Sequence, residues 1–157
     1  MCIRDRPNRE PDILKSWARH SIFQKALDQS KQSKKYVLHD GPPYANGDIH
    51  IGHAVNKILK DFIIKSKIMS GYHTPFTPGW DCHGLPIELQ VEKKYGKGKF
   101  KDNANAFVAA CREFANKQIE KQKADFIRLG VFADWDNPYT SMDKEVEAGI
   151  VRSLSNC

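Results

Sequence analysis

The sequence predicts an α/β fold, because a short β-prone segment, a glycine- and proline-rich loop, an amphipathic helix and a second extended segment follow one another between residues 36 and 77. Two strands joined through a helix form a βαβ unit, whose strands run parallel and whose crossover is almost always right-handed. The chain has 157 residues, a length that suits one domain or part of one.

The first strand is predicted at residues 36–39, YVLH, and it ends where the loop begins with Gly41, Pro42 and Pro43. Proline has no backbone N–H to donate to a ladder, so the chain must leave the sheet there. The helix is predicted from near His50 to Gly71, because apolar residues recur at helical spacing. These residues are Val55, Ile58, Leu59, Phe62, Ile63 and Met69. The second strand is predicted at residues 72–77.

Four further helices are predicted outside this unit. One covers residues 11–30, with Pro11 in its first turn. The others cover residues 85–95, 103–129 and 144–154, with a turn at residues 96–99 and Gly130 as the C-terminal stop of the longest helix.

Composition narrows the classes of protein. The formal net charge of +6 is compatible with a nucleic-acid partner, but runs such as residues 31–35 are ordinarily a solvated surface. The longest apolar stretches fall well short of the roughly 18 residues that a membrane helix needs, and the N-terminus has no apolar signal core. We therefore expect a cytoplasmic protein without membrane contact.

The four cysteines are Cys2, Cys82, Cys111 and Cys157. They show no C-x-x-C spacing, which disfavours a disulfide framework and a thiolate zinc site. We expect reduced thiols. The adjacent pair of Cys82 and His83 offers only two candidate ligands, whereas zinc sites need three or four, so we expect no protein-bound metal.

The segment of residues 50–53, HIGH, favours phosphate binding. His50 and His53 lie three residues apart at the start of a predicted helix, just beyond a predicted strand. Free N–H groups and the helix dipole attract an anion there, Gly52 allows close approach of a ligand, and imidazoles can donate hydrogen bonds. Taken alone, an H-x-x-H pair also fits two structural histidines on the surface or in the core. The neighbouring sequence must therefore decide whether the pair binds phosphate.

Longer motifs surround and follow the histidine pair. Residues 41–47, GPPYANG, followed by HIGH, resemble the signature of class I aminoacyl-tRNA synthetases, and the isoleucine branch fits best. Residues 79–88, GWDCHGLPIE, resemble the second block of isoleucyl enzymes. Residues 125–130, DFIRLG, with Asp134 and Trp135, resemble the next segment of bacterial members. The resemblance covers nearly everything from Pro11 onward.

The resemblance implies an ATP site. His50 and His53 are the implied catalytic residues, which stabilise the phosphates of ATP during attack by the isoleucine carboxylate. Gly41, Asn46 and Gly52 are the further implied ATP-binding residues, with Gly52 leaving room for the adenine. Magnesium is expected to arrive with ATP rather than in a protein cage.

The resemblance also implies an isoleucine site. Asp81 is expected to hold the α-ammonium group, although an aspartate there also fits a helix N-cap or a loop. Pro42 is expected in the apolar wall around the substrate side chain, and a plain turn proline is the other interpretation. Trp80 and Tyr44 are more often packing residues than ligand contacts.

The implied fold is the first half of a Rossmann-like class I synthetase nucleotide-binding fold. Residues 1–34 are predicted to be an N-terminal helical extension, in which residues 1–6 do not resemble the family and suggest a sequence artefact. Residues 35–157 are predicted to be the N-terminal part of the catalytic domain, truncated before the editing insertion.

The family also uses a KMSKS-type lysine loop, an editing domain and an anticodon-binding region, none of which these residues contain. We expect the chain alone to be inactive, because the lysine loop would supply positive charge to the departing pyrophosphate. We also expect it to be marginally stable or self-associating, because apolar surface is left uncovered. The implied full-length protein is a monomer that acts on isoleucine, ATP and tRNA(Ile). It is expected to need an editing activity, because enzymes of this family select isoleucine over valine by only about 150-fold.

Three other interpretations compete. A small H-x-G-H nucleotidyltransferase suits the length, but it has no reason to carry residues 79–88. Valyl and leucyl ligases are related, yet residues 43–47 and 80–84 suit the isoleucine branch better. A basic RNA-binding module explains the charge but not the histidine pair.

Overall fold

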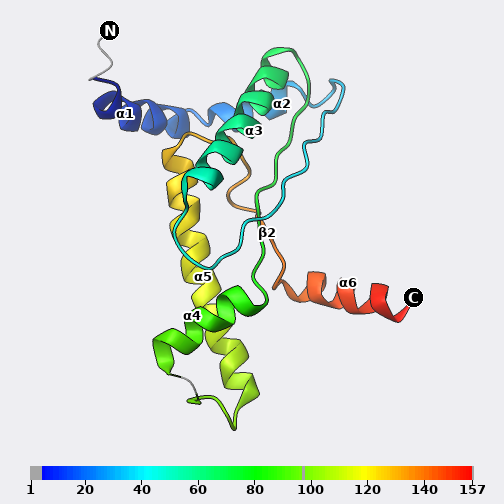
Figure 1. Cartoon of the computed structure of the whole chain (residues 1–157). Coiled ribbons are helices and arrows are strands. Elements are labelled where there is room, and N and C mark those ends of the chain that lie inside the picture. The colour runs from blue at the N-terminus through cyan, green and yellow to red at the C-terminus, as the bar shows by residue number, and fades with distance from the viewer. Residues whose placement is uncertain (1–4, 97, 157) are drawn as a thin grey trace. The chain divides into compact units, whose positions relative to one another are not determined.

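The computed structural model describes residues 5–96 and 98–156 (Figure 1). Along the chain the helices are α1 (Arg6–Arg19), α2 (Ile22–Gln29), α3 (Ile51–Met69), α4 (Leu85–Tyr95), α5 (Ala104–Arg128) and α6 (Lys144–Ser155), and the strands are β1 (Gly79–Trp80) and β2 (Tyr139–Thr140). The predicted artefact at residues 1–6 falls partly, and Cys2, Lys97 and Cys157 fall wholly, outside the described residues.

The chain divides into two compact units. Unit 1 comprises Met1–His39, Ile51–Phe76 and Ala124–Asp134. Unit 2 comprises Asp40–His50, Thr77–Lys123 and Trp135–Cys157. The predicted boundary between residues 34 and 35 stays a prediction.

Unit 1 is built from α1, α2, α3 and the last turn of α5. Its buried apolar side chains come from all of these except α1, and from the segments after α3 and α5; they are Leu27, Ile64, Phe76, Phe126, Val131 and Ala133. Phe132 joins the two N-terminal helices to this core, because its ring lies 5.2 Å from the ring of Trp17 and 5.4 Å from that of Phe23. Such ring pairs add stability beyond the area they bury.

An ion pair between a buried carboxylate and a partly buried ammonium lies within unit 1. Lys65 donates to Asp61 Oδ2 at 2.5 Å and to the carbonyl oxygen of Gly130 at 2.8 Å. Asp61 is only 6% exposed, and its Oδ1 accepts the backbone N–H of Phe132 at 2.8 Å. The ammonium of Lys65 also lies 4.3 Å from the ring centre of Phe132. One carboxylate therefore ties α3 to the chain that follows α5.

The single helix predicted for residues 11–30 is wrong, because the structure has two helices there. α1 already begins at Arg6, so Pro11 lies inside it, and α1 and α2 are separated by His20 and Ser21. Ser21 adopts the left-handed conformation, with φ of 48°, which no residue of a right-handed helix can have. Apolar periodicity continued across this break and concealed it.

The strands predicted at residues 36–39 and 72–77 are also wrong as regular strands. The two segments meet only at an isolated parallel bridge between Lys35 and His73, with hydrogen bonds from Tyr36 N to His73 O and from His73 N to Lys34 O. The predicted parallel course on either side of α3 is confirmed. Pro75 lies within the second segment, while Pro42 and Pro43 come shortly after the first segment and Pro78 directly after the second. Residues without an N–H cannot donate to a ladder.

The sheet that the structure shows lies in unit 2. β1 and β2 pair in parallel, with Gly79 opposite Tyr139 and Trp80 opposite Thr140. Tyr139 N donates to Pro78 O at 2.9 Å, and Ser141 N donates to Trp80 O at 3.1 Å. A Cβ added at Gly79 would lie 3.1 Å from the Tyr139 ring, so glycine allows the close approach of the two strands.

Four helices are confirmed close to their predicted bounds: α3, α4, α5 and α6. Gly130 follows α5 with φ of 80°, a conformation that favours glycine and ends a helix. In unit 2, α4 and α5 bury aliphatic side chains, which are Ile87, Val91, Ala115 and Ile119. Of the predicted turn at residues 96–99, the described residues Gly98 and Lys99 lie in a turn, and Lys99 N donates to Gly96 O at 3.4 Å.

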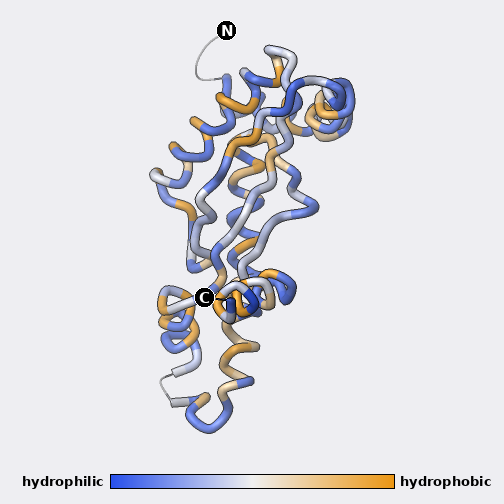
Figure 2. The backbone as a smooth tube through the Cα atoms, turned by 90° about the vertical axis from the view of Figure 1, so that its right-hand side faces the viewer, coloured by the Kyte–Doolittle hydropathy of each residue, from blue (hydrophilic) through white to orange (hydrophobic). Residues whose placement is uncertain are grey.

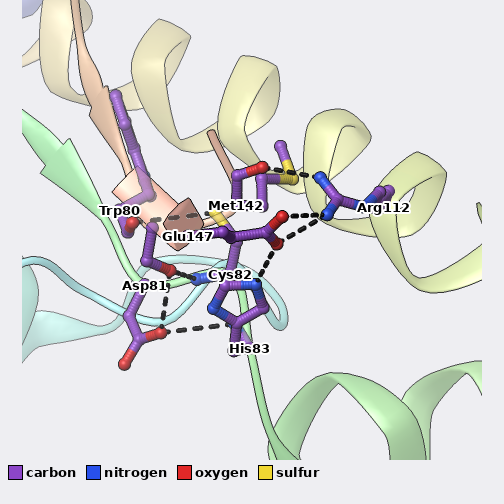
Figure 3. A network of polar contacts seen from close by, with 8 residues as sticks. Trp80, Asp81, Cys82, His83, Arg112, Met142 and Glu147 are labelled. Atoms are coloured by element: carbon purple, nitrogen blue, oxygen red, sulfur yellow. Dashed lines mark hydrogen bonds and ion pairs between the residues drawn. The ribbon is translucent and has the colours of Figure 1, made fainter. Parts of the chain in front are cut away.

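α6 is connected to the rest of unit 2 by charge. Arg112 on α5 donates two hydrogen bonds to the Glu147 carboxylate, at 2.5 and 2.6 Å, and one to the carbonyl oxygen of Met142 at 2.6 Å (Figure 3). His83 Nε2 lies 2.9 Å from Glu147 Oε1. The hydrogen bonds from Arg112, and then that from His83, lower the pKa of the Glu147 carboxyl.

Hydrophobic and hydrophilic residues alternate along the helices (Figure 2). Within the described part of the chain, every helix is too short or too polar to traverse a bilayer. Several large apolar side chains on α3 remain exposed; they are Ile51, Val55, Leu59, Phe62, Ile63 and Met69. The expected uncovered apolar surface is therefore present, while self-association stays a prediction.

We expect Asp61→Ala to destabilise unit 1 by about 1–3 kcal/mol, the usual cost of leaving a buried hydrogen-bonding group without its partner. The substitution leaves the Phe132 N–H and the Lys65 ammonium without their carboxylate. Chemical denaturation of the chain measures the loss. The control is Asp12→Ala, because Asp12 pairs with Lys15 at an exposed site, and exposed pairs contribute about 0–1 kcal/mol. An equal loss of unfolding free energy in both variants would show that Asp61 contributes no more to stability than an exposed carboxylate.

We expect Arg112→Gln to raise the pKa of Glu147, because Arg112 is the main cause of its depression. A lowered folded-state pKa stabilises the fold above the unfolded-state pKa, and this contribution is lost as pH falls through the folded value. Carboxyl NMR titration measures the change. Glu113 is an internal control, since Lys117 lowers its pKa. An unchanged titration of Glu147 refutes the prediction.

Candidate functional site

The proline-rich loop and the end of β1 lie side by side in unit 2. Asp81 N donates to Pro43 O at 2.8 Å, and Ala45 N donates to Asp81 O at 2.9 Å. These two bonds form an isolated parallel bridge between Tyr44 and Asp81. Two sequence motifs that are far apart in the chain are thus joined through their backbones, which brings the loop containing Pro42 and Asn46 beside Asp81.

The carboxylate of Asp81 is oriented through one of its oxygens. Oδ1 accepts the hydroxyl of Ser141 at 3.2 Å and the backbone N–H of His83 at 3.2 Å. Ser141 is itself fixed, because its oxygen accepts the Cys82 N–H at 2.8 Å. Both of these bonds use Oδ1, so Oδ2 can accept a hydrogen bond from a ligand cation.

Cys82 and His83 have structural contacts (Figure 3). Cys82 is buried, its Sγ lies 3.6 Å from Trp80 O, and burial raises the pKa of its thiol. Cys82 and Cys111 are both free thiols. His83 pairs with Glu147. Within the described residues no group of three or more potential metal ligands comes together.

Trp80 is part of the packing of unit 2. Its side chain is 1% exposed, and its ring lies 6.3 Å from that of Trp135. Its indole N–H donates to Gln122 Oε1 at 3.0 Å. Tyr44, by contrast, is 47% exposed. The ring of Tyr44 is therefore available for contacts, while its backbone is fixed by the bridge to Asp81.

Pro42 lies against the start of β1. A Cβ added at Gly79 would approach Pro42 Cβ to 3.5 Å, so Gly79 leaves space for the proline ring. Pro42 is exposed and Asn46 is partly exposed. An added Cβ at Gly41 meets nothing within 4 Å, so packing inside the chain does not require glycine there.

The histidine motif lies at the start of α3, as the sequence predicts. His50 is the exposed residue that immediately precedes α3, and His53 lies in the first turn of that helix and is partly buried. Gly52 between them is exposed. The first turn of any helix has N–H groups without intrahelical partners, which is the feature that attracts phosphate.

Two residues of this region were not identified from the sequence. Ser141 orients Asp81 from the segment after β2, and Gln122 reaches the loop from α5. No spacing pattern marks either one. Gln122 lies among other polar residues of a long helix, and only its complete burial distinguishes it.

Comparisons with known proteins agree with these motifs. The family described as "tRNA synthetases class I (I, L, M and V)" matches residues 12–157. The isoleucine–tRNA ligase of Shewanella piezotolerans is 64% identical over 148 residues, which are 94% of this chain and 16% of that protein. The isoleucine–tRNA ligase of Actinobacillus pleuropneumoniae serotype 5b is 59% identical over 150 residues, 96% of this chain and 16% of that protein. This chain thus spans about a sixth of their length.

A solved structure supports the fold. The LeuRS of Agrobacterium radiobacter K84, in a ternary complex with tRNA and LeuAMS, matches with a TM-score of 0.76 and 24% identity over 97% of this chain and 18% of that one. Together with the family match, this likeness makes the α/β fold that of a Rossmann-like synthetase fragment. The family match and the curated relatives do not favour the small nucleotidyltransferase. Because the family match covers nearly the whole sequence, this chain belongs to the class I tRNA synthetases of the I, L, M and V group.

Proposed function

We propose that this chain carries part of the active site of an isoleucine–tRNA ligase, which activates isoleucine with ATP and transfers it to tRNA(Ile). The observation that carries the proposal is the backbone pairing of the loop at Pro43 and Ala45 with Asp81, which assembles two motifs beside each other. The identity of 59–64% to isoleucine–tRNA ligases supports isoleucine over valine or leucine as the substrate.

Asp81 is proposed to bind the α-ammonium group of isoleucine. A carboxylate held by Ser141 and by the His83 N–H keeps a fixed direction, and its Oδ2 is the acceptor for the ammonium. Charge-assisted hydrogen bonds of this kind are about twice as strong as neutral ones. Pro42 is proposed to contribute apolar surface for the side chain of the substrate.

His50 and His53 are proposed to act on ATP. An oxygen of the isoleucine carboxylate attacks the α-phosphorus, the bond to the bridging oxygen breaks, and pyrophosphate leaves with the electron pair. The imidazoles and the N-terminal N–H groups of α3 donate hydrogen bonds to the phosphate oxygens, whose charge grows in the transition state. Gly41, Asn46 and Gly52 are the proposed contacts to the nucleotide, and Mg²⁺ is bound together with ATP.

The location, oligomeric state and tRNA substrate of the full-length ligase are proposed from the similarity to isoleucine–tRNA ligases. The ligase acts as a monomer in the cytoplasm, and the acceptor of the activated isoleucine is tRNA(Ile). An apolar pocket separates substrates that differ by one methylene by only about 10–200-fold. We therefore propose that an editing activity, located outside residues 12–157, removes mischarged valine.

The test uses a chimeric ligase, in which the aligned 148-residue segment of the Shewanella piezotolerans enzyme is replaced by that of this chain. Its ATP–pyrophosphate exchange should be driven by isoleucine more strongly than by valine or leucine. In this chimera, Asp81→Asn should raise KM for isoleucine by about 10- to 150-fold, the equivalent of about 1.5–3 kcal/mol for a hydrogen bond to a charged group.

The control for this substitution is Asp102→Asn, the same change at an exposed position. It should leave KM for isoleucine unchanged. If the Asp81→Asn chimera has an unchanged KM for isoleucine, Asp81 does not have the proposed role. Exchange driven best by another amino acid rejects the proposed substrate.

His50→Ala and His53→Ala should each lower kcat of the chimera by about 10²- to 10³-fold, as is usual when one donor to a developing charge is removed. KM for isoleucine should change little, because these residues face the phosphates in the proposal. His20→Ala is the control, since His20 is exposed and hydrogen-bonds to Ser16 of the preceding helical turn. Retention of kcat in both variants argues against the phosphate role.

A further inference from the structure

Gln122 is a fully buried amide in the C-terminal third of α5, with 0% of its surface exposed. Its Oε1 accepts the indole N–H of Trp80 at 3.0 Å. Its Nε2 donates to Tyr44 O at 3.0 Å and to Gly47 O at 2.7 Å. Both amide hydrogens and the amide oxygen are thus used, so the side chain is held in one orientation.

The loop needs these donors. Residues 42 and 43 are prolines, which donate no backbone hydrogen bond, and one side of the loop is already paired through Ala45 with Asp81. The carbonyl groups of Tyr44 and Gly47 turn to the other side, where Gln122 satisfies both. These two bonds are partly buried, and a typical intramolecular hydrogen bond contributes about 0.5–1.5 kcal/mol.

Few side chains can replace this amide. The position requires two donors for the loop and one acceptor for the indole of Trp80. Glutamate has the same shape but no donor when ionised, methionine has a similar volume but no donor at all, and lysine has no acceptor. The chemistry of the contacts therefore selects an amide.

We propose that Gln122 is a positioning residue for amino-acid activation, which fixes the loop around Asn46 and connects it to the strand that precedes Asp81. This inference rests on the proposed function. Asn46 lies between the two carbonyl groups that Gln122 holds, and Trp80 directly precedes Asp81. One side chain thus sets the position of the proposed nucleotide contact relative to the proposed amino-acid contact.

The experiment compares Gln122→Glu with Gln122→Met in the chimeric ligase. Burial raises the pKa of a carboxyl, so the new glutamate is protonated at low pH and ionised at high pH. The protonated form can donate to one loop carbonyl, whereas the ionised form repels both. Relative to the unsubstituted chimera at each pH, kcat/KM for ATP of Gln122→Glu should be at least about tenfold lower at pH 9 than at pH 6.

Gln122→Met should lose kcat/KM for ATP to a similar extent at both pH values, because its side chain has no titrating group. Gln32→Glu provides the matched control, since Gln32 is exposed and its substitution should produce no pH-dependent loss.

Three outcomes overturn the proposal. The first is a normal kcat/KM for ATP in both Gln122 variants, with only a lower melting temperature. The second is a loss of the same size at pH 6 and pH 9 in Gln122→Glu. The third is loss of cooperative folding in both variants, which gives Gln122 a purely structural role. Failure of the proposed function is seen separately, because the unsubstituted chimera then shows no isoleucine-driven exchange.

Discussion

The proline-rich loop at residues 41–47 cannot complete its own hydrogen bonds, and the arrangement of unit 2 is a consequence of this constraint. Two consecutive prolines provide carbonyl groups without N–H groups, so the loop cannot become a strand of a regular sheet. Its backbone is instead paired on one side with Asp81 and on the other with the amide of Gln122. A loop fixed in this way keeps its position without regular secondary structure.

The same arrangement orients the proposed substrate contacts. Asp81 is held through its backbone by the loop and through Oδ1 by Ser141, so its second oxygen has a defined direction. Preorganised groups of this kind stabilise charge without first reorganising, which is the main electrostatic contribution to catalysis. Arg112, Glu147 and His83 extend the support from α5 and α6 to the residues after Asp81.

Unit 1 uses a different means of fixation. There a buried carboxylate, Asp61, accepts both the ammonium of Lys65 and a backbone N–H of the segment after α5. Removing this carboxylate is costly, because the N–H of Phe132 and the partly buried ammonium of Lys65 lose their acceptor. This pair connects α3, the helix that His50 immediately precedes, to the core around Phe126 and Phe132.

The sequence by itself determined the helices α3 to α6 and the motifs around His50 and Asp81, because apolar periodicity and motif spacing are local properties of the chain. It missed the break at Ser21, which periodicity concealed, and it predicted regular strands at residues 36–39 and 72–77, where the structure has a single bridge. Only the tertiary structure decided that the loop pairs with Asp81, that Ser141 bonds to the Asp81 carboxylate and that Gln122 bonds to the loop. Those contacts are hydrogen bonds between residues far apart in the chain, and no local pattern encodes them.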